Sequence, residues 1–531
     1  MTYTAINLGP IISTFSMSRR PRELWAASYL FSHLMKCIYE TITSNNCTII
    51  SPASPNNTNK KITNISGIGI YPDRVFFEAT SNTKTILKTA TIKFTSQTGL
   101  NKDHLAQYFN LMSATCEANK ESEAIAILNR ALDVLELCNY AADKESSDAI
   151  RRLITKTSNS QLFKIATGDP NKFPFEVNTL AEIATAELQG KDSSEWKKII
   201  ENSIDLNEDF FYKALLGVDT FKDMFKSHHK YFCIVQADGD NVGKTVSHPD
   251  LADGQVKAIS IALVEFGMKA AEIILNYGGM PIYAGGDDLL FIAPVIGKDS
   301  SNIFSLINKI ENEAFNGVVD EVAKCGPDNN GIYNNGNKIE ASLSFGISMS
   351  YYKYPLYEAF ESARNLLFYS AKKIDSKKAV AWSFRKHSGG TFNAAFSLKD
   401  ENMQECFTNL INHTTSGTVV SAVAHKMRTH EQLVLNVMQE VKAHPTQNNE
   451  VHPRLNALFE KILEFQDTEY FKAVKQIMPP LYNVPQFRKS ATRPDRCVFE
   501  SESDRNRRFM SQYFSNKQTI IHTPPPFPHG E

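Results

Sequence analysis

The fold of this chain is decided by residues 281–292, which read PIYAGGDDLLFI. Two apolar runs of strand length flank two glycines and two aspartates, a pattern that predicts a β-hairpin with its charged residues at the tip. Gly285 and Gly286 permit positive φ and let a bulky ligand approach the backbone. Asp287 and Asp288 repel each other at one tip, which favours a divalent cation beside them over an ordinary polar turn.

A second acidic cluster lies upstream, where an apolar run that begins at Tyr231 ends in Asp238-Gly239-Asp240. The chain then turns and reaches Gly243, Lys244 and Thr245. This is not a P-loop, because its two glycines enclose one residue fewer than the Walker pattern requires. Main-chain N–H groups around Asn241, Val242 and Gly243 are still expected to cradle a triphosphate, with Lys244 as the counter-charge.

The pattern around the two clusters predicts a βαββαβ core of the ferredoxin-like kind, within an α+β protein. A buried helix is expected over 253–276, followed by the hairpin, a helix over 302–323, a strand over 341–349, and an added helix and strand. In this order the first strand and the hairpin are neighbours, so Asp238, Asp287 and Asp288 can share two metal ions. Two ions at one carboxylate cluster are typical of nucleotidyl transfer.

These motifs resemble the second palm domain of the large subunit of type III CRISPR effector complexes. The matching residues are GGDD at 285–288, DGDN at 238–241, SFGI at 344–347, YKYPL at 352–356, and Ala371-Lys372 with Lys377. Residues 8–11 and 22–30 are similar to the first palm of the III-B branch. The resemblance implies two palm domains akin to nucleotide cyclases, Mg²⁺ or Mn²⁺ as the metal, and ATP as substrate. It also implies that a nucleotide second messenger is made once guide RNA has captured target RNA.

Four domains are expected from the composition shifts along 531 residues. The first is a degenerate palm over 1–100, in which Pro72 and Asp73 stand where the second palm has Gly-Gly-Asp-Asp. With one carboxylate it should not hold two metals, but it can bind a small molecule against the catalytic palm, with Arg22 or Ser28 lining the pocket. The alternative is that this segment only supplies core and surface residues. The others are a helical domain over 101–226, the catalytic palm over 227–390, and a C-terminal helical domain over 391–531.

The candidate site residues fall into three groups. The expected catalytic residues are Asp238, Asp287 and Asp288, and the same three with Gly239 are the expected metal ligands. Nucleotide binding is assigned to the following residues: Asp240, Asn241, Val242, Gly243, Lys244, Gly285, Gly286, Ser344, Lys372 and Lys377. Ser344 is expected to contact a base or ribose, unless it only makes room. The two lysines match a recurring family pattern that favours phosphate contact over a helix-end role.

Composition narrows the classes of function. The formal net charge is −1, so RNA contacts are expected to be shared with other subunits of a complex. The eight cysteines form no Cys-x-x-Cys pair and predict reduced cytoplasmic thiols without a zinc site. No secretory or membrane-spanning stretch is evident. No His-Asp dipeptide occurs, so DNA cleavage is not expected. His228 and His229 are expected to face apart and to lack a carboxylate partner.

The C-terminal part has helical periodicity over 399–411, 421–441, 453–465 and 468–477. Basic and aromatic residues interleave over 487–509, as an RNA or partner surface does, although solvated surface is the commoner explanation. The proline-rich stretch over 523–528 is expected to be extended or disordered.

Three functional hypotheses remain open. The first is an ATP-using, metal-dependent nucleotidyltransferase that makes a cyclic oligoadenylate, with conjugation of AMP to S-adenosylmethionine as the alternative at the same site. The second is a catalytically silent scaffold of the complex. The third is a free-standing diguanylate-type cyclase, which is disfavoured because Leu289-Leu290 follows the hairpin tip where that family has Glu-Phe.

Overall fold

We examined a computed structural model of the protein. It describes most of the first 399 residues and two later helices. The described ranges are 1–54, 67–78, 83–137, 142–155, 162–163, 179–189, 191–202, 208–252, 254–328, 330–334, 336–374, 377–388, 391–399, 429–444 and 452–462.

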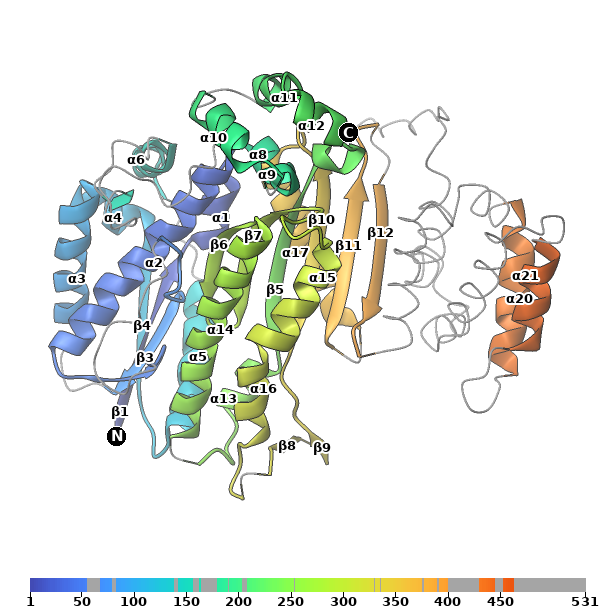
Figure 1. Ribbon diagram of the computed structural model, residues 1–531. Coiled ribbons are helices and arrows are strands. Elements are labelled where there is room, and N and C mark those ends of the chain that lie inside the picture. The colour runs from blue at the N-terminus through green and yellow to red at the C-terminus, as the bar shows by residue number, and fades with distance from the viewer. Residues whose placement is uncertain are drawn as a thin grey trace, which may run out of the picture. The chain divides into compact units, whose positions relative to one another are not determined.

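The first sheet has four antiparallel strands in the order β2-β3-β1-β4 (Figure 1). Its strands are β1 (Thr2–Gly9), β2 (Thr48–Ser51), β3 (Arg74–Glu78) and β4 (Asn110–Glu117). Helices connect β1 to β2 and β3 to β4: α1 (Ile11–Ser16), α2 (Pro21–Ser44), α3 (Thr83–Thr98) and α4 (Lys102–Tyr108). This is a βαββαβ domain, and its fourth strand lies beyond residue 100. The expected boundary at that residue therefore falls inside the first sheet domain.

The second sheet repeats this topology, with the order β10-β5-β7-β6 for its four core strands. These strands are β5 (Tyr231–Asp240), β6 (Met280–Gly285), β7 (Asp288–Pro294) and β10 (Ser342–Tyr351). The helices between them are α13 (Val242–Val246), α14 (Gln255–Tyr277), α15 (Ile303–Lys309), the π-helical turn η3 (Ile310–Ala314) and α16 (Asn316–Ala323). Next come α17 (Leu356–Tyr369), η4 (Ala371–Lys373), β11 (Ala379–Arg385) and β12 (Thr391–Ser397). Both sheet domains confirm the expected α+β palm architecture.

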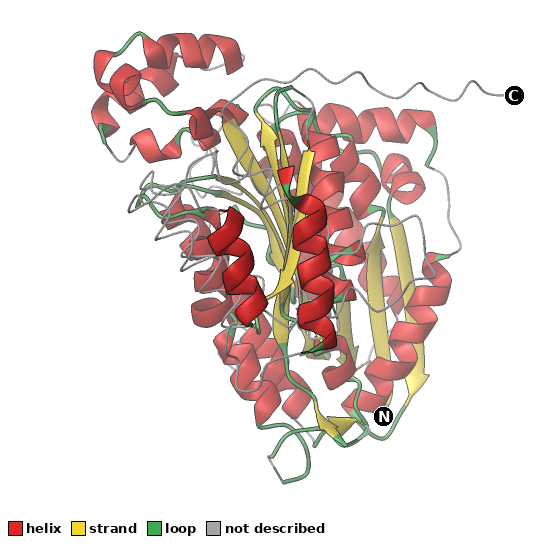
Figure 2. Cartoon of the chain, turned by 90° about the vertical axis from the view of Figure 1, so that its right-hand side faces the viewer, coloured by secondary structure: helices red, strands yellow, loops and turns green. Residues whose placement is uncertain are grey.

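Helices lie against the strands in Figure 2, and glycines allow two of the helices of the second sheet domain to pack closely on its strands. An added Cβ at Gly267 of α14 would lie 2.6 Å from the carbonyl oxygen of Ala284 in β6. Gly346 of β10 lies even closer to the backbone of α17, because a Cβ there would meet the carbonyl oxygen of Ala363 and lie 2.6 Å from the main-chain nitrogen of Leu367. Gly278, at φ 97°, ends α14 in the left-handed conformation.

The two sheet domains lie in one compact unit that comprises Met1–Lys378 and Trp382–Gly389. A loop of the first domain runs beside β6 of the second, where the N–H of Ala284 donates to the carbonyl of Gly69 at 2.9 Å. The hydroxyl of Ser260 in α14 also accepts a hydrogen bond from the N–H of Ala53, at 2.9 Å. These contacts fix the first domain against the helix and hairpin of the second.

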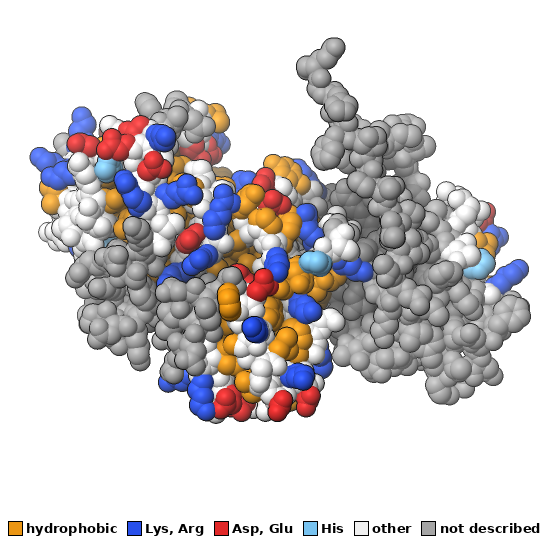
Figure 3. Space-filling model, turned by 90° about the horizontal axis from the view of Figure 1, so that it is seen from above, with side chains coloured by type: hydrophobic (Ala, Val, Ile, Leu, Met, Phe, Trp, Pro, Cys, Tyr) orange, Lys and Arg blue, Asp and Glu red, His pale blue; other side chains and the backbone are white. Residues whose placement is uncertain are grey.

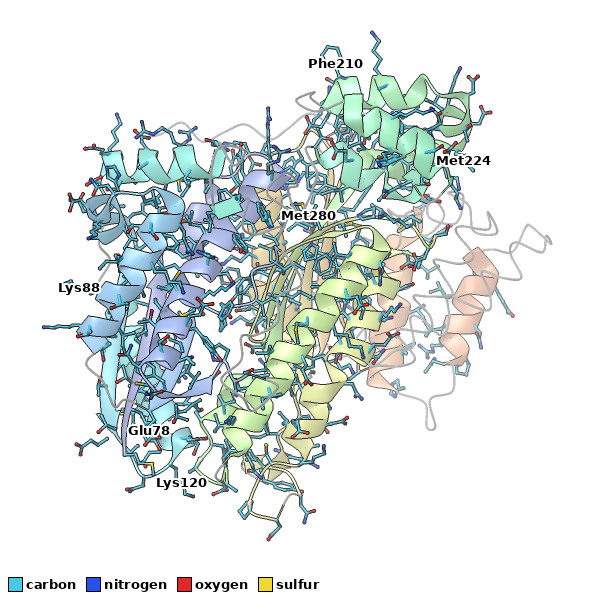
Figure 4. All side chains as sticks on the ribbon, turned by 60° about the vertical axis from the view of Figure 1, so that its left-hand side comes forward. Glu78, Lys88, Lys120, Phe210, Met224 and Met280 are labelled. Carbon is cyan, nitrogen blue, oxygen red and sulfur yellow. The ribbon has the colours of Figure 1, made fainter. Side chains whose placement is uncertain are left out.

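The expected helical domain over 101–226 is divided between two places. α5 (Glu121–Glu136) contacts β1 and β4, and α6 (Lys144–Thr155) contacts α2 and α4, so both belong to the first sheet domain. The later helices form a hydrophobic core around Trp196, Phe211 and Phe221, which also includes Tyr352 from the segment after β10. They are α8 (Leu180–Ala184), α9 (Ala186–Gln189), α10 (Ser193–Asn202), α11 (Glu208–Leu216) and α12 (Asp219–Met224). Phe210 and Met224 lie on the outside of this group (Figure 4).

A second compact unit comprises Ala379–Ala381 and Gly390–Glu531. Beyond β12 it contains α20 (Glu431–Ala443) and α21 (Pro453–Ile462), which agree with two of the expected C-terminal helices. The other expected helices, the basic and aromatic stretch over 487–509 and the proline-rich stretch lie outside the described residues. Among the residues that the structure describes, no helix combines the length and the apolar character that crossing a membrane requires.

Candidate active site

The aspartates at 287 and 288 lie at the tip of a tight hairpin. Gly285 pairs with Asp288, so only Gly286 and Asp287 connect β6 to β7. Gly286 has φ 66°, which suits the first central position of a type II′ turn, where glycine is strongly preferred. An added Cβ at Gly285 would lie 2.6 Å from the hydroxyl oxygen of Tyr283. The turn therefore needs glycine at 286 because of its positive φ, and at 285 because a side chain there would clash with Tyr283.

The three expected catalytic carboxylates lie at the same end of the second sheet, although their oxygen atoms are not all within 4.8 Å of one another. The pairing of β5 with β7 puts Ala237 opposite Leu289, so the next residues outward are Asp238 and Asp288. The carboxyl groups of these two residues share a hydrogen bond. Gly239 lies directly under Asp287, since an added Cβ there would be 2.6 Å from its Oδ2. The sequence-based expectation that residues about 50 positions apart form one acidic cluster matches this geometry.

Burial and mutual repulsion make this cluster hard to ionise. Desolvation, followed by the nearby charge of Asp238, raises the pKa of Asp287 to about 7. The same two causes hold the pKa of Asp288 well above its ordinary value. The donors here are oxygen atoms, three carboxylates and the main-chain carbonyl of Gly239, which is the ligand type that Mg²⁺ and Mn²⁺ prefer. The residues therefore fit a divalent metal, which would offset the repulsion.

The raised pKa of Asp287 predicts a pH dependence of stability. Between its unfolded pKa near 4 and its folded pKa of about 7, the folded state binds more protons than the unfolded state. The free energy of unfolding of the metal-free protein should therefore fall as the pH rises through this window. We expect a lower thermal midpoint at pH 8 than at pH 5.5 in the presence of a chelator, and a smaller difference in Asp287→Asn. An equal pH dependence in both proteins would contradict the assignment.

Asp240 lies in a buried hydrogen-bond network at the end of β5. Its side chain is fully buried and accepts hydrogen bonds from four groups. The donors are Ser342 Oγ at 2.9 Å, Ser344 Oγ at 2.7 Å, the Lys378 N–H at 2.9 Å and Lys372 Nζ at 2.9 Å. The last of these, an ion pair, helps to keep the pKa of Asp240 below its ordinary value despite burial. Ligand contact by Asp240 and Ser344 stays a prediction, and in the structure the two side chains are hydrogen-bonded to each other.

Lys372 also contacts the acidic cluster. Its ammonium group forms an ion pair with Asp238 and donates to the main-chain carbonyls of Asp238, at 3.0 Å, and Gly239, at 2.8 Å. Lys377 lies nearby in the chain with φ 54°, an unusual backbone conformation for a lysine. Lys372 thus lies at the end of β5, where a phosphate contact was expected, and Lys378, which follows Lys377, donates its N–H to Asp240 there.

The turn after β5 places its residues in different environments. Asn241 adopts φ 65° and its side chain donates to the carbonyl of Glu340 at 2.9 Å. Val242 is buried, whereas Lys244 is exposed. Nothing lies within 4 Å of a Cβ added at Gly243. In the first turn of a helix the N–H groups have no intrahelical acceptor, so the start of α13 offers main-chain donors beside the acidic cluster.

Sequence reasoning missed one buried group that supports the site, the carboxyl group of Glu311. Glu311, in the π-helical turn η3, accepts a hydrogen bond from the Leu343 N–H at 3.0 Å and pairs with Lys378 Nζ at 3.2 Å. Burial raises the pKa of Glu311 although Lys378 opposes the shift. π-Helical turns interrupt helices and are frequent at functional sites. Nothing in the local sequence indicates the interruption, because the apolar periodicity continues through it.

The first sheet domain contains an altered copy of the same position. β1 and β3 pair Asn7 with Arg74, the positions equivalent to Asp238 and Asp288 in the second sheet. Arg74 pairs with Asp133 at 2.8 Å and Glu136 at 2.6 Å, both in α5. An arginine and an asparagine in place of two aspartates leave no carboxylate pair for a metal. This agrees with the expectation that the first palm does not hold two metals.

A cavity of about 150 Å³ lies between the two sheet domains and reaches Asp288. Its walls are mainly apolar, with Phe15 and Phe360 on one side and Leu290 on another. Three of its polar atoms, Ser28 Oγ, Tyr71 OH and Gln236 Oε1, are buried without a hydrogen-bond partner among the described residues. Such atoms are costly unless a ligand or water satisfies them. Ser28 therefore lines a pocket as expected, whereas Arg22 is not among the lining residues.

The prediction for His228 and His229 is wrong in its geometry. Both rings contact the same atom, Glu187 Oε2, at 2.7 Å and 3.0 Å, because the 3₁₀ turn η2 (Ser227–Lys230) brings them to one side. The Lys226 N–H donates to His229 Nδ1 at 2.9 Å. That bond requires the proton of a neutral His229 ring on Nε2, which then donates to Glu187. The cluster is a hydrogen-bond network in which His229 Nε2 is not available as a metal ligand.

The close approach at Gly239 predicts a mutational effect. In Gly239→Ala the new methyl group would meet both Asp287, at 2.6 Å, and Val242, at 2.8 Å. We expect the hairpin tip to move away from Asp238, with metal binding weakened by about tenfold or more. Gly243→Ala is the matched control, because a Cβ there meets nothing. Mn²⁺ titration of the two variants would check this, and equal affinities would contradict the proposed packing.

The fold and the site together define a palm domain of the nucleotide-cyclase type with an acidic cluster at its hairpin. Residues 231–381 match the model of the Cas10/Cmr2 second palm domain, and residues 3–201 match that of the N-terminal region of the CRISPR-associated protein Cmr2. The chain belongs to the Cas10/Cmr2 family.

A curated relative and two solved structures are similar to this chain. The CRISPR system Cmr subunit Cmr2 of Pyrococcus furiosus is 30% identical over 232 residues, which cover 38% of this chain and 24% of the relative. The match thus takes in about a quarter of that relative. The type III-B Cmr-beta complex in its apo state matches with a TM-score of 0.54 and 11% identity, over 97% of this chain and 82% of the other. The same complex bound to cognate target RNA matches with a TM-score of 0.53 and 11% identity, over 94% of this chain and 80% of the other. At this identity the structures support the fold alone.

Proposed function

We propose that this chain is the large subunit of a type III-B RNA-guided effector complex, and that its second palm is an ATP-using nucleotidyltransferase. The observation that carries the proposal is the convergence of Asp238, Asp287 and Asp288 beside a cavity. A merely structural hairpin would not be expected to carry three carboxylates that repel one another at one half-buried place, since the arrangement lowers stability. The family membership adds the expectation of other effector subunits, guide RNA and target RNA as partners.

The residues have separate roles in this proposal. Asp238, Asp287, Asp288 and the carbonyl of Gly239 would hold Mg²⁺ or Mn²⁺, which supplies hydroxyl activation and phosphate stabilisation when bound. The N–H groups of Asn241 to Gly243 and the ammonium of Lys244 would bind the triphosphate of the donor ATP. Lys372 and Lys377 would add positive charge on the other side of β5. Gly285 and Gly286 keep the tip narrow enough for the nucleotide to reach it.

The cavity between the palms is the proposed acceptor pocket. Its apolar walls suit a flat ring, while Ser28, Tyr71 and Gln236 provide polar atoms that are not otherwise satisfied. With a second ATP as acceptor, its ribose hydroxyl would attack the α-phosphate of the donor and release pyrophosphate. Repetition and closure of the chain would give a cyclic oligoadenylate.

A second candidate acceptor is S-adenosylmethionine. Asp73 from the first palm and Asp288 from the second both line the cavity, so the pocket has an acidic side. Two carboxylates favour a positively charged ligand, and S-adenosylmethionine carries a sulfonium and an ammonium group. The product would then be an AMP conjugate, formed at the same metal site.

One experiment separates these products. The assembled complex is incubated with cognate target RNA, ATP and Mg²⁺, with and without S-adenosylmethionine, and the products are identified by mass spectrometry. Cyclic products without the methyl donor support the first candidate, and products that require it support the second. If no product forms under any condition while RNA binding is normal, the remaining hypothesis is that the chain is a catalytically silent scaffold of the complex.

The surface is consistent with RNA contacts that are shared among subunits. On the face shown in Figure 3, basic, acidic and apolar side chains are interspersed over the described residues. A protein that binds nucleic acid alone usually shows a continuous basic surface. We therefore propose that guide and target RNA reach this chain mainly through its partners.

A further inference from the structure

The ammonium group of Lys372 lies among four oxygen atoms at the end of β5. It contacts the carbonyl oxygens of Asp238 and Gly239 at 3.0 Å and 2.8 Å, and Asp240 Oδ1 at 2.9 Å. The fourth oxygen is Asp238 Oδ2, with which it forms an ion pair. Two main-chain carbonyls and two carboxylates around one cation form a coordination-like environment rather than a single surface ion pair.

Two of these four groups are also ligands of the proposed metal site. The side chain of Asp238 and the carbonyl of Gly239 now serve Lys372, and they are the groups that β5 would offer to a divalent cation. A divalent ion on the same oxygens would come within a few ångströms of the ammonium group. At that separation the two cations repel each other strongly in a partly buried site. Full metal coordination and the present position of Lys372 are therefore mutually exclusive.

The surroundings allow Lys372 to leave without disrupting β5. Asp240 keeps three other donors, which are the hydroxyls of Ser342 and Ser344 and the N–H of Lys378. The Lys372 side chain is 14% exposed and extends from the short turn η4, so its flexible stem has a path to solvent. Asp238, in contrast, loses the positive charge that now compensates it. The residue that most needs a replacement cation is thus a proposed metal ligand.

We propose that Lys372 is an internal counter-ion that competes with the metal at Asp238 and Gly239 and is drawn off by the triphosphate. This inference rests on the proposed function and concerns the regulation of its site. A triphosphate offers Lys372 more negative charge than the carboxylates do, so arrival of the nucleotide releases the oxygens for the metal. Metal and nucleotide would then bind cooperatively, and the metal alone would bind weakly.

The test is Mn²⁺ binding to the full chain without nucleotide, followed by electron paramagnetic resonance. Lys372→Gln should bind Mn²⁺ about tenfold more tightly than the wild type, because the competing cation is gone. Lys373→Gln is the matched control, since it removes the same charge one residue away from an exposed position. It should change the affinity by less than about twofold. Equal or weaker binding by Lys372→Gln would overturn the proposal.

Cooperativity gives a second readout. A non-hydrolysable ATP analogue should tighten Mn²⁺ binding in the wild type and much less in Lys372→Gln. The same enhancement in both proteins would overturn the proposal. If neither protein binds Mn²⁺ with or without the analogue, the metal site itself fails and the proposed function fails with it. The two failures are therefore distinguishable.

A measurement on the wild type covers the case in which Lys372→Gln does not fold. Reductive methylation of lysine amines, quantified by peptide mass spectrometry, reports the accessibility of each ammonium group. We expect Lys372 to react slowly in the presence of a chelator and severalfold faster with saturating Mn²⁺, whereas Lys373 reacts equally in both. An unchanged rate at Lys372 would contradict its displacement.

Discussion

Replacing Asp287 and Asp288 together by asparagine is expected to abolish nucleotide synthesis while making the metal-free protein more stable. The two carboxylates would be the main metal ligands of the hairpin, so product formation should fall by at least about a thousandfold. Asparagine keeps the size of each side chain but removes like charges that burial makes costly. The thermal midpoint at pH 8 with a chelator should therefore rise by a few degrees.

These opposite signs make the prediction specific. A structural role for the hairpin would predict lower stability and lower activity together. Asp299→Asn is a suitable control, because Asp299 caps a local turn through Ser301 and lies outside the acidic cluster. Product formation by mass spectrometry and unfolding by calorimetry, on the same preparations, would check both effects. Unchanged synthesis in the double variant would remove the metal assignment.

The second large effect is expected at Asp240. Asp240→Ala would leave Lys372, two serine hydroxyls and the Lys378 N–H without their shared acceptor in a buried place. Breaking a buried ion pair by removing one partner typically costs about 3–5 kcal/mol in the free energy of unfolding. Denaturant unfolding should therefore show a loss of that order, and the loss should not depend on nucleotide.

A matched variant separates this structural role from ligand binding. Ser344→Ala removes one of the four donors, so it should cost only about 1 kcal/mol. A nucleotide ligand at Asp240 would instead give a variant of normal stability with weakened ATP binding. If Asp240→Ala unfolds at the wild-type denaturant concentration, the network described for this residue is not what holds β5 to β10.

The acidic site was accessible to sequence reasoning because its signals are local. Two apolar runs around Gly-Gly-Asp-Asp specify a hairpin, and an apolar run that ends in Asp238 specifies a strand with a carboxylate at its end. The βαββαβ order then places this strand beside the hairpin. The proximity of Asp238, Asp287 and Asp288 therefore follows from the topology. The roles of Asp240 and Ser344 did not follow. Along the chain both resemble ligand residues, and only their cross-strand positions show that they bind each other.

The boundary of the first palm was misplaced for a similar reason. β4 has alternating, half-buried residues and follows two helices, so its membership of the first sheet depends on pairing with β1 more than 100 residues earlier. The histidine pair was also misjudged. Neighbouring residues face apart in a strand, but the 3₁₀ helix η2 directs the rings of His228 and His229 toward Glu187, which lies about 40 residues away in the sequence.

The sequence by itself determined the second palm fold, its hairpin and its three carboxylates, whereas the first palm was expected from the family resemblance. These depend on periodicity, on turn-forming glycines and on strand order, all of which are written locally. Only the tertiary structure decided which polar side chain each aspartate contacts and which oxygen atoms surround Lys372. Such features depend on side chains from distant segments that compete for the same partner, and the packing of the folded chain decides which of them makes the contact.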